Sequence, residues 1–136
     1  MKTPDGYTAI TFEIKPYDID AAGHVNNSVY INWLEDLRVK LFSEIIPMES
    51  LTERKIFLVV AATSIRYRAP LFLYNKPLGT LKIDNYSKGI WYLSAKFMLE
   101  DRVVAEASQK CVLIDRENNK MLRKIASTYA EREYEI

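Results

Sequence analysis

The sequence of 136 residues has few of the residues that form covalent or metal cross-links, with one cysteine and one histidine. The single cysteine, Cys111, cannot form an internal disulfide, which excludes the class of small disulfide-stabilised domains. The single histidine, His24, excludes any metal site that needs two imidazoles from one chain. The longest apolar run, 56–62, is far shorter than the ~20 residues of a membrane-spanning helix, and residues 1–6 lack the apolar segment of a signal peptide. We therefore expect a cytoplasmic protein with no membrane insertion.

An excess of charge of one sign is also missing. The chain has 19 Lys and Arg residues and 18 Asp and Glu residues, so its formal net charge is +1. This balance excludes a surface built as a whole to bind nucleic acid or an anionic membrane. The hydrophobic share of 49% is enough for a proper core, and at this length roughly two-thirds of the unfolded surface can be buried. We expect residues 1–136 to form a single domain without a nucleic-acid partner.

The apolar pattern changes its period along the chain. Residues 7–15 alternate as in a half-buried strand, which Pro16 ends because proline has no N–H to donate. From Asn27 onward apolar residues recur every three or four positions, which predicts a helix with a broad apolar face that ends before Pro47. Further strands are predicted at 55–69, 78–87, 91–99 and 103–116, followed by a helix or tail at 121–136.

The order of these elements predicts an α+β fold. The last four predicted strands are joined by short turns, which implies antiparallel pairing. One apolar helix against one antiparallel sheet is a two-layer architecture. Because the apolar face of the helix is wide, we expect the five-stranded sheet to curl around it.

The segment that could carry chemistry is the loop before the long helix. It holds carboxylates, the only histidine and two asparagines immediately before the predicted helix start. A helix start presents unpaired N–H groups and the positive end of its dipole, so it can hold an oxyanion, and Gly23 allows close approach of the backbone to a ligand. A carboxylate aimed at that point could act as a general base or a nucleophile in acyl transfer. The residues alone leave a second interpretation open, in which the loop only caps the helix.

Other kinds of site have less support. A phosphatase with an Asp-x-Asp nucleophile would need a larger parallel α/β fold. A metal site made of Asp18, Asp20 and His24 would have no further groups to orient its ligands. The chain has no Gly-x-Ser-x-Gly segment, so a serine triad is not supported. We expect no metal ion and no bound cofactor.

Two segments resemble a known family. The string Asp20-x-x-Gly23-His24-Val25-Asn26-Asn27-x-x-Tyr30 is similar to the active-site stretch of the 4-hydroxybenzoyl-CoA thioesterase family of hotdog-fold proteins. Residues 65–70, Ile-Arg-Tyr-Arg-Ala-Pro, resemble the strand of that family that ends in Tyr-x-x-Pro. The resemblance implies a hotdog fold, in which a curved antiparallel sheet wraps a central helix. It also implies hydrolysis of acyl-CoA or acyl carrier protein thioesters by a homodimer with its sites at the interface, and pairing of dimers into tetramers is left open.

The resemblance also assigns roles to residues. Asp20 matches the catalytic carboxylate, as nucleophile or general base. Asn27 matches the position at the helix start whose backbone N–H polarises the thioester carbonyl. His24 matches the histidine of plant-type acyl carrier protein thioesterases, although Ala22 stands where that pattern has asparagine. The residues expected to bind substrate are Gly23, Asn26, Tyr30 and Tyr67.

Three alternatives to acyl-CoA hydrolysis stay open from the sequence. The substrate could be an acyl carrier protein thioester, the chain could bind an acyl thioester or lipid without cleaving it, or it could be a dehydratase of the same general fold. Arg66, Arg68, Lys88 and Lys120 are all candidates to meet the phosphates of CoA, and the sequence does not choose among them. Cys111 is expected to be a small apolar residue of the core.

Overall fold

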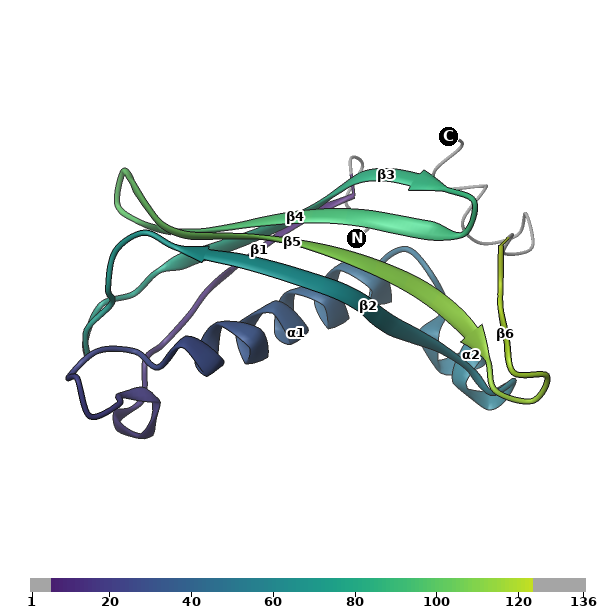
Figure 1. The fold of residues 1–136 in the computed structure, drawn as a ribbon, viewed down its shortest axis with the longest axis horizontal. Coiled ribbons are helices and arrows are strands. Elements are labelled where there is room, and N and C mark those ends of the chain that lie inside the picture. Colours follow the sequence, from purple (N-terminus) through teal and green to yellow (C-terminus); the bar gives the residue numbers. More distant parts are fainter. Residues whose placement is uncertain (1–5, 124–136) are drawn as a thin grey trace.

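A computed structural model describes residues 6–123 and shows one curved antiparallel sheet arched over a long helix (Figure 1). The predicted α+β fold, with its central helix and curled sheet, is confirmed. In chain order the elements are β1 (Tyr7–Thr11), the 3-10 turn η1 (Pro16–Asp18), α1 (Asn27–Ser43), α2 (Met48–Glu53), β2 (Ile56–Tyr67), β3 (Leu78–Ser87), β4 (Ile90–Leu99), β5 (Arg102–Asp115) and β6 (Lys120–Met121).

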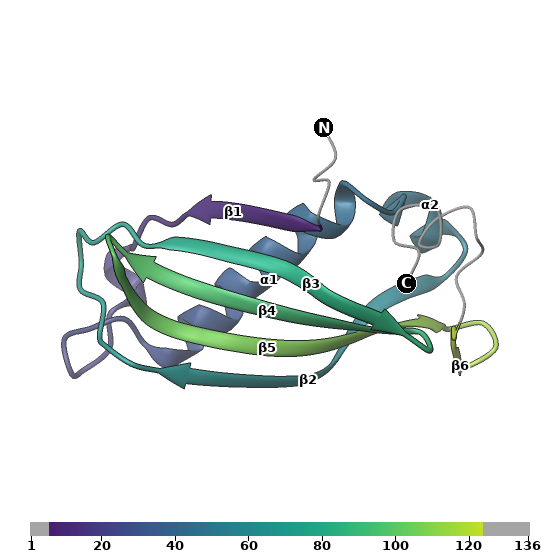
Figure 2. The same ribbon diagram turned by 90° about the horizontal axis from the view of Figure 1, so that it is seen from above.

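The sheet has the strand order β1-β3-β4-β5-β2, and every neighbouring pair is antiparallel. Viewed from above, α1 crosses beneath the strands at an angle, and it starts under the end of β2 (Figure 2). Lys40 Nζ donates to the carbonyl of Ala9 in β1 at 2.9 Å, which ties the far half of the helix to the opposite edge. Within the described chain β2 pairs only with β5, so one side of this long strand is a free edge.

Helix α1 forms at the predicted place because its apolar residues share one face. The side chain of Asn26 caps it by accepting from Ser28 N–H at 2.9 Å. Aromatic rings fill the layer between helix and sheet: Trp33 stacks on Phe12 with 4.9 Å between ring centroids. The buried residues of the helix are Val29, Tyr30, Trp33, Leu34, Leu37, Leu41 and Phe42.

Strand β2 contains a bulge. Its register against β5 shifts between Val60 and Ala62, so one extra residue lies in β2 at this point. Side chains of a strand alternate between its faces, and an extra residue changes which positions face inward. Val60 pairs with the buried Cys111, whereas beyond the bulge Tyr67 pairs with the buried Ala105. Even-numbered residues therefore face α1 before the bulge, and odd-numbered residues face it afterwards.

The structure adds three short elements that the sequence pattern did not predict. Besides η1, the helix α2 follows Pro47 and buries Leu51. Strand β6 pairs with the end of β5, so the described sheet has six strands where five were predicted, and Met121 belongs to this strand and to no helix. The remainder of the helix or tail predicted at 121–136 lies outside the described residues from 124 onward.

Two further predictions, on Cys111 and on membrane-spanning helices, can be compared with the described residues. Cys111 is fully buried among apolar side chains, and burial raises the pKa of its thiol to about 11, so it is an unreactive core residue as predicted. None of the helices found between residues 6 and 123 combines the length and apolarity needed to cross a membrane.

Candidate active site

The loop before α1 is a tight hairpin closed by a bridge between Ile19 and Val25. Asp20 N–H donates to the carbonyl of His24 at 3.0 Å, and Gly23 N–H donates back to the carbonyl of Asp20 at 3.0 Å. Gly23 has φ +90, a conformation that disfavours any residue with a Cβ. The glycine predicted to allow close approach of a ligand is therefore required by the turn itself.

The helix start and the end of β2 meet at a common pocket. A cavity of about 250 Å³ is lined by residues of the loop, the first turn of α1 and the end of β2: His24, Val25, Asn27, Tyr30, Tyr67, Arg68, Ala69 and Pro70. Tyr67 Oη donates to the carbonyl of Asn27 at 3.1 Å and so joins β2 to the helix start. Four of the predicted site residues, His24, Asn27, Tyr30 and Tyr67, thus line one cavity although 43 residues of sequence (67 − 24 = 43) separate the first from the last.

The backbone N–H of Asn27 is available to a ligand. Of the two asparagines at the helix start, Asn26, which was expected to bind substrate, caps the helix with its side chain and does not line the cavity. No hydrogen bond found among residues 6–123 uses the N–H of Asn27. At the first position of a helix this donor points away from the helix body and lies at the positive end of its dipole. It is therefore placed to hold a developing negative charge.

The two tyrosines of the cavity stay protonated at neutral pH. Burial raises the pKa of Tyr30 to about 12, with a smaller contribution from Tyr67, and burial also raises the pKa of Tyr67. Their rings pack edge to face with centroids 5.2 Å apart. Each hydroxyl is a hydrogen-bond donor and not a nucleophile. Tyr30 is both a buried core residue and part of the cavity wall.

Asp20, Gly23 and Asn26 do not line this cavity. Asp20 Oδ1 accepts from Ala22 N–H at 2.9 Å, an interaction within its own turn. Its side chain is partly exposed, and Oδ2 accepts no hydrogen bond from residues 6–123. The catalytic role predicted for Asp20 therefore stays a prediction, and one carboxylate oxygen is free to take it up.

A metal site at this loop finds no support. Among residues 6–123 no three His, Cys, Asp or Glu side chains lie close enough together to hold an ion. Asp18 Oδ2 instead accepts from Lys15 N–H at 2.9 Å and stabilises the turn η1, as expected of a loop residue.

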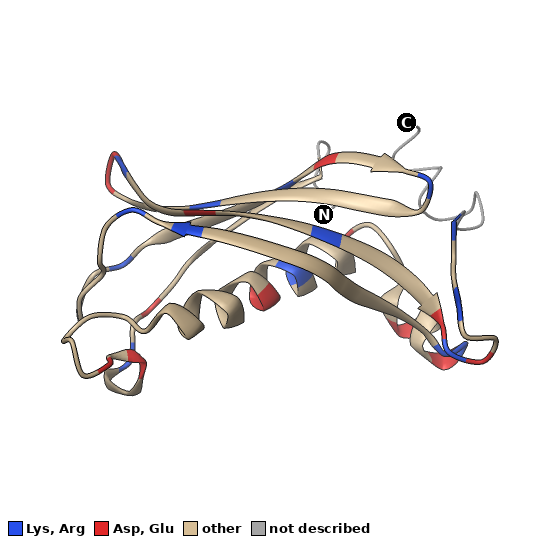
Figure 3. Ribbon diagram, viewed as in Figure 1, with Lys and Arg blue, Asp and Glu red and all other residues tan. Residues whose placement is uncertain are grey.

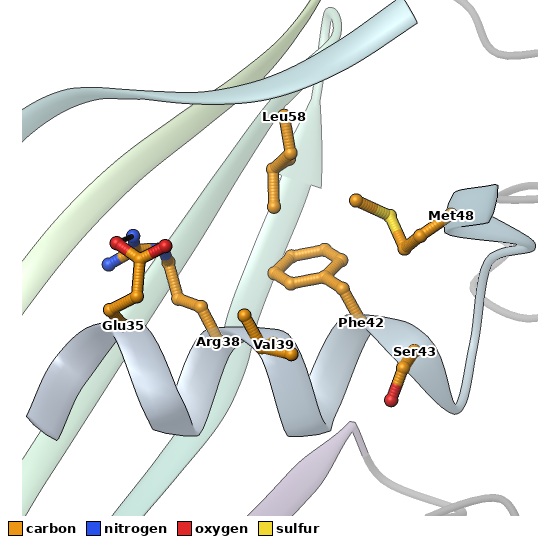
Figure 4. Close-up of a pocket in the computed structure, with 7 residues that line it drawn as sticks. All are labelled: Glu35, Arg38, Val39, Phe42, Ser43, Met48 and Leu58. Atoms are coloured by element: carbon orange, nitrogen blue, oxygen red, sulfur yellow. Dashed lines mark hydrogen bonds and ion pairs between the residues drawn. The ribbon is translucent and has the colours of Figure 1, made fainter. Parts of the chain in front are cut away.

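A second pocket lies toward the other end of α1 (Figure 4). Its volume is about 240 Å³, and it opens between α1, α2 and the first half of β2. Phe42, Met48 and Leu58 point toward one another inside it, and the ion pair of Arg38 with Glu35 lies at its polar side (Figure 4). Sequence reasoning did not find this pocket, because its walls come from three elements with no shared motif.

Arg38 is a nearly buried charge beside this apolar pocket. Its side chain is 11% exposed; it donates to Gln109 Oε1 at 3.2 Å and to Glu35 Oε1 at 2.8 Å. Gln109, itself buried, donates onward to Thr63 Oγ1 at 3.0 Å. This network joins α1 to β5 and β2 and satisfies polar groups that would be costly to bury alone. No local pattern predicts this network, because Arg38 and Gln109 are 71 positions apart.

One curled antiparallel sheet around one long helix is the architecture of the hotdog class of domains. A family model described as the thioesterase-like superfamily matches residues 14–128. The chain belongs to this superfamily, and the family resemblance and the enzyme class predicted from the loop are confirmed.

Individual relatives agree with this assignment. Over 112 residues the chain is 30% identical to the long-chain acyl-CoA thioesterase FadM of Escherichia coli, which covers 81% of this chain and 85% of that protein. The crystal structure of YbaW, a probable thioesterase from Escherichia coli, has a TM-score of 0.79 at 27% identity and covers 93% of this chain and 94% of its own. A hypothetical protein of Staphylococcus aureus, solved in complex with CoA, has a TM-score of 0.81 at 16% identity and covers 89% and 78% respectively, which shows the shared fold.

Proposed function

We propose that this chain hydrolyses acyl-CoA thioesters to a free acid and CoA, with Asp20 as the catalytic carboxylate and without a metal ion or bound cofactor. The observation that carries the proposal is the N–H of Asn27, which forms no hydrogen bond with residues 6–123 and belongs to a residue that lines the cavity beside the loop of Asp20 and His24. The similarity to a long-chain acyl-CoA thioesterase supports acyl-CoA as the substrate class.

The proposed chemistry needs few groups. A thiolate with a pKa near ~8.5 is a good leaving group, so little acid assistance is required when the carbon–sulfur bond breaks. The carbonyl oxygen becomes negative during attack, and the Asn27 N–H is placed to stabilise it. A donor of this kind lowers the barrier by about 3–4 kcal/mol in other acyl-transfer enzymes.

The free oxygen of Asp20 is proposed to begin the reaction. While Oδ1 accepts from Ala22, Oδ2 either removes a proton from the attacking water or attacks the carbonyl itself. His24 lines the cavity next to this loop, packs edge to face on Phe72 with 6.2 Å between ring centroids, and is proposed to orient the water. Label found in the Asp20 carboxylate after a single turnover in isotopically labelled water would show direct attack, with water opening the resulting anhydride at the aspartyl carbon and releasing the acid.

A second copy of the chain is proposed to complete the site. Among the described residues one edge of β2 is unpaired, and Ile31 and Val39 expose 46% and 61% of their surface on the outward face of α1, with Tyr67 40% exposed near the same edge. Antiparallel pairing of β2 with its copy would satisfy the free edge and cover this apolar surface. The proposed dimer rests on this unpaired edge and on these exposed side chains.

Edge pairing would also bring the two pockets of different copies together. Leu58, near the start of β2, lines the pocket of Figure 4, and Tyr67, at the end of β2, lines the cavity beside Asp20. In an antiparallel pair of identical strands the start of one lies beside the end of the other. We therefore propose that the acyl group of a thioester held at Asn27 enters the apolar pocket of the partner subunit.

A thiol-release assay tests the proposed function. Acyl-CoAs of graded chain length are offered to the wild type, to Asp20→Asn and to the matched variant Asp18→Asn, which removes a carboxylate from the same loop. We expect Asp20→Asn to lower kcat at least about 100-fold, the size of one lost catalytic group, and Asp18→Asn to change it less than about threefold. Equal turnover by all three proteins would remove Asp20 from the mechanism.

One observation favours a second candidate function. The carboxylate of Asp20 is bonded within its own turn and does not line the cavity, as expected of a chain that binds an acyl thioester without cleaving it. Binding of acyl-CoA with no thiol released over a long incubation would select this alternative. Acyl carrier protein thioesters belong in the same assay as a further substrate.

A cytoplasmic location is proposed on the ground that the one cysteine forms no internal disulfide.

A further inference from the structure

Three cationic side chains surround one carboxylate on the outer face of the sheet. In the strand register Arg66 of β2 and Lys96 of β4 both lie directly opposite Glu106 of β5, from its two sides. Arg68 Nε donates to Glu106 Oε2 at 2.8 Å. We call Arg66, Arg68 and Lys96 the cation cluster. Three positive charges against one negative charge leave a local excess of 3 − 1 = +2, although the whole chain carries only +1.

The stability of the fold does not explain this arrangement. The side chains of Arg68 and Glu106 are 46% and 39% exposed, and an ion pair exposed to this extent contributes little. The hydrogen bond from Arg68, followed by the charges of Arg68, Arg66 and Lys96, holds the pKa of Glu106 below its usual value, so this carboxylate is ionised at neutral pH. It neutralises one cation and leaves the others available to an anion.

The cation cluster reaches the candidate active site through Arg68. Arg68 is one of the residues that line the cavity of Asn27 and Tyr67. Arg66 and Arg68 project from the same face of β2 about 7 Å apart, and Lys96 lies two strands away, at about 10 Å from Arg66. Figure 3 shows Lys and Arg positions in blue at the end of the sheet that lies over the start of α1.

The structure separates this cluster from the other cations considered for phosphate binding. Lys88 lies in the turn between β3 and β4, and Lys120 lies in β6. Both are at the opposite end of the sheet from the loop that precedes α1 (Figure 2). Neither lines the cavity of Asn27.

We propose that Arg66, Arg68 and Lys96 bind the phosphate groups of the nucleotide part of CoA while its pantetheine arm enters the cavity beside Asn27. The proposal rests on the proposed function for the identity of the ligand. Guanidinium groups bind phosphate through paired hydrogen bonds, and several cations at this spacing suit a ligand with separated phosphates. The nucleotide of CoA carries a diphosphate and a separate 3′-phosphate, whereas the arm of an acyl carrier protein carries a single phosphodiester. The cluster therefore favours CoA over a carrier protein.

Two substrates that share one acyl group test the assignment. Acyl-CoA carries all the phosphates, and the matched acyl-pantetheine carries none. The measured quantity is the ratio of kcat/KM for the two substrates, in which general damage to the catalytic site cancels. We expect Arg66→Ala and Lys96→Ala each to lower this ratio about tenfold, the size of a lost charge-assisted hydrogen bond. Lys110→Ala, which removes an outward-facing lysine further along β5, is the control and leaves the ratio unchanged.

Removal of the carboxylate gives a change of the opposite sign. Glu106→Gln keeps the shape of the side chain and removes its competition for the cations, so we expect the acyl-CoA to acyl-pantetheine ratio to rise severalfold. An unchanged ratio in Arg66→Ala and Lys96→Ala would overturn the proposal. A larger loss with acyl carrier protein than with acyl-CoA would also overturn it.

Failure of the proposed function has a different signature. If no thioester is cleaved, calorimetric binding of free CoA and of pantetheine replaces the kinetic ratio. In that measurement Arg66→Ala is expected to weaken CoA about tenfold and to change pantetheine little. Equal weakening of both ligands, or of neither, would overturn the assignment of the cation cluster whether or not the chain is a hydrolase.

Discussion

The two ends of α1 lie in different surroundings. At its N-terminal end the helix meets a polar hairpin, presents the unbonded N–H of Asn27 and borders an open cavity with hydroxyl groups in its wall. Toward its C-terminal end Phe42 packs edge to face on Trp91 with centroids 5.5 Å apart and forms the inner wall of an apolar pocket. One helix therefore carries the groups suited to acyl transfer at one end and much of the packed core at the other.

This difference shows how one helix can meet two demands that conflict locally. A reactive end must leave a donor unbonded and a cavity open, which costs stability. The packing of Phe42 toward the other end supplies stability without contact with the proposed reacting groups. If the comparison holds, substitutions toward the C-terminal end change the free energy of unfolding, and substitutions of the polar groups at the N-terminal end change mainly catalysis.

Truncation of Phe42 is expected to have the largest effect and tests whether the C-terminal end of α1 stabilises the fold. Phe42 is fully buried, so Phe42→Ala leaves a cavity between α1 and β4 and is expected to lower the free energy of unfolding by about 3–5 kcal/mol. Unfolding in urea measures the change. The control is Val39→Ala, one turn earlier and 61% exposed, which is expected to cost less than about 0.5 kcal/mol. A loss below about 1 kcal/mol in Phe42→Ala would contradict the comparison.

Tyr30 tests whether the reactive end also contributes to stability. Its pKa is raised from its ordinary value of 10 to about 12, so it stabilises the fold fully below pH 10 and this stabilisation is lost as the pH rises toward 12. The full loss is about 2–3 kcal/mol. The pKa of the Cys111 thiol is raised from 9 to about 11, so ionisation of this thiol also lowers the stability of the fold over an overlapping pH range. Unfolding is therefore measured in a Cys111→Ala background, where Tyr30→Phe is expected to flatten the alkaline decline; an equally steep decline would contradict the assignment.

Enlarging the side chain at Leu58 sharpens the proposed link between the two ends. Leu58→Trp fills the apolar pocket and is expected to lower kcat/KM for long acyl chains about tenfold relative to short ones, because the methylene groups of a long chain can no longer be buried. Leu58→Met, of similar volume, is the control and is expected to keep the wild-type chain-length profile. A parallel loss for all chain lengths would separate the pocket from acyl binding.

Loss of the helix cap is the smallest predicted effect. Asn26→Ala removes the bond to Ser28 N–H and is expected to cost about 1 kcal/mol of unfolding free energy. Asn27→Ala is the matched control for stability, because the bond of Asn27 to Tyr67 uses its backbone carbonyl and survives the substitution. Equal losses in the two variants would show that the cap assignment is wrong.

The fold could be predicted where local patterns decide it. Apolar residues at helical spacing from Val29 to Leu41 and the alternation from Trp91 to Leu99 define α1 and β4, and both are confirmed. The family string in the loop identified the superfamily. Strand β6 was missed because its two residues gain their partner only through the turn that returns the chain to β5.

The candidate site could be predicted only in part, because much of it depends on pairing distant in sequence. Tyr67 was assigned from its strand motif, but its bond to Asn27 joins positions 40 residues apart. The position of Lys96 opposite Glu106 follows from strand register, which alternation alone does not determine. Asp20 shows that a match to a family motif does not predict the orientation of a side chain. Its type and place matched the family, yet its side chain accepts a hydrogen bond within its own turn.

The extra residue in β2 has a consequence for how this strand tolerates change in length. Deletion of Ala61 would keep every pairing of β2 with β5 and restore regular alternation, because Val60 faces α1 and Ala62, its new neighbour, faces outward. Tyr67 would still face the helix, and Arg66 and Arg68 would still face outward. Loss of a residue further along, such as Ser64, would instead turn over the residues between it and the bulge, so the irregular step is the place where β2 best tolerates a lost codon.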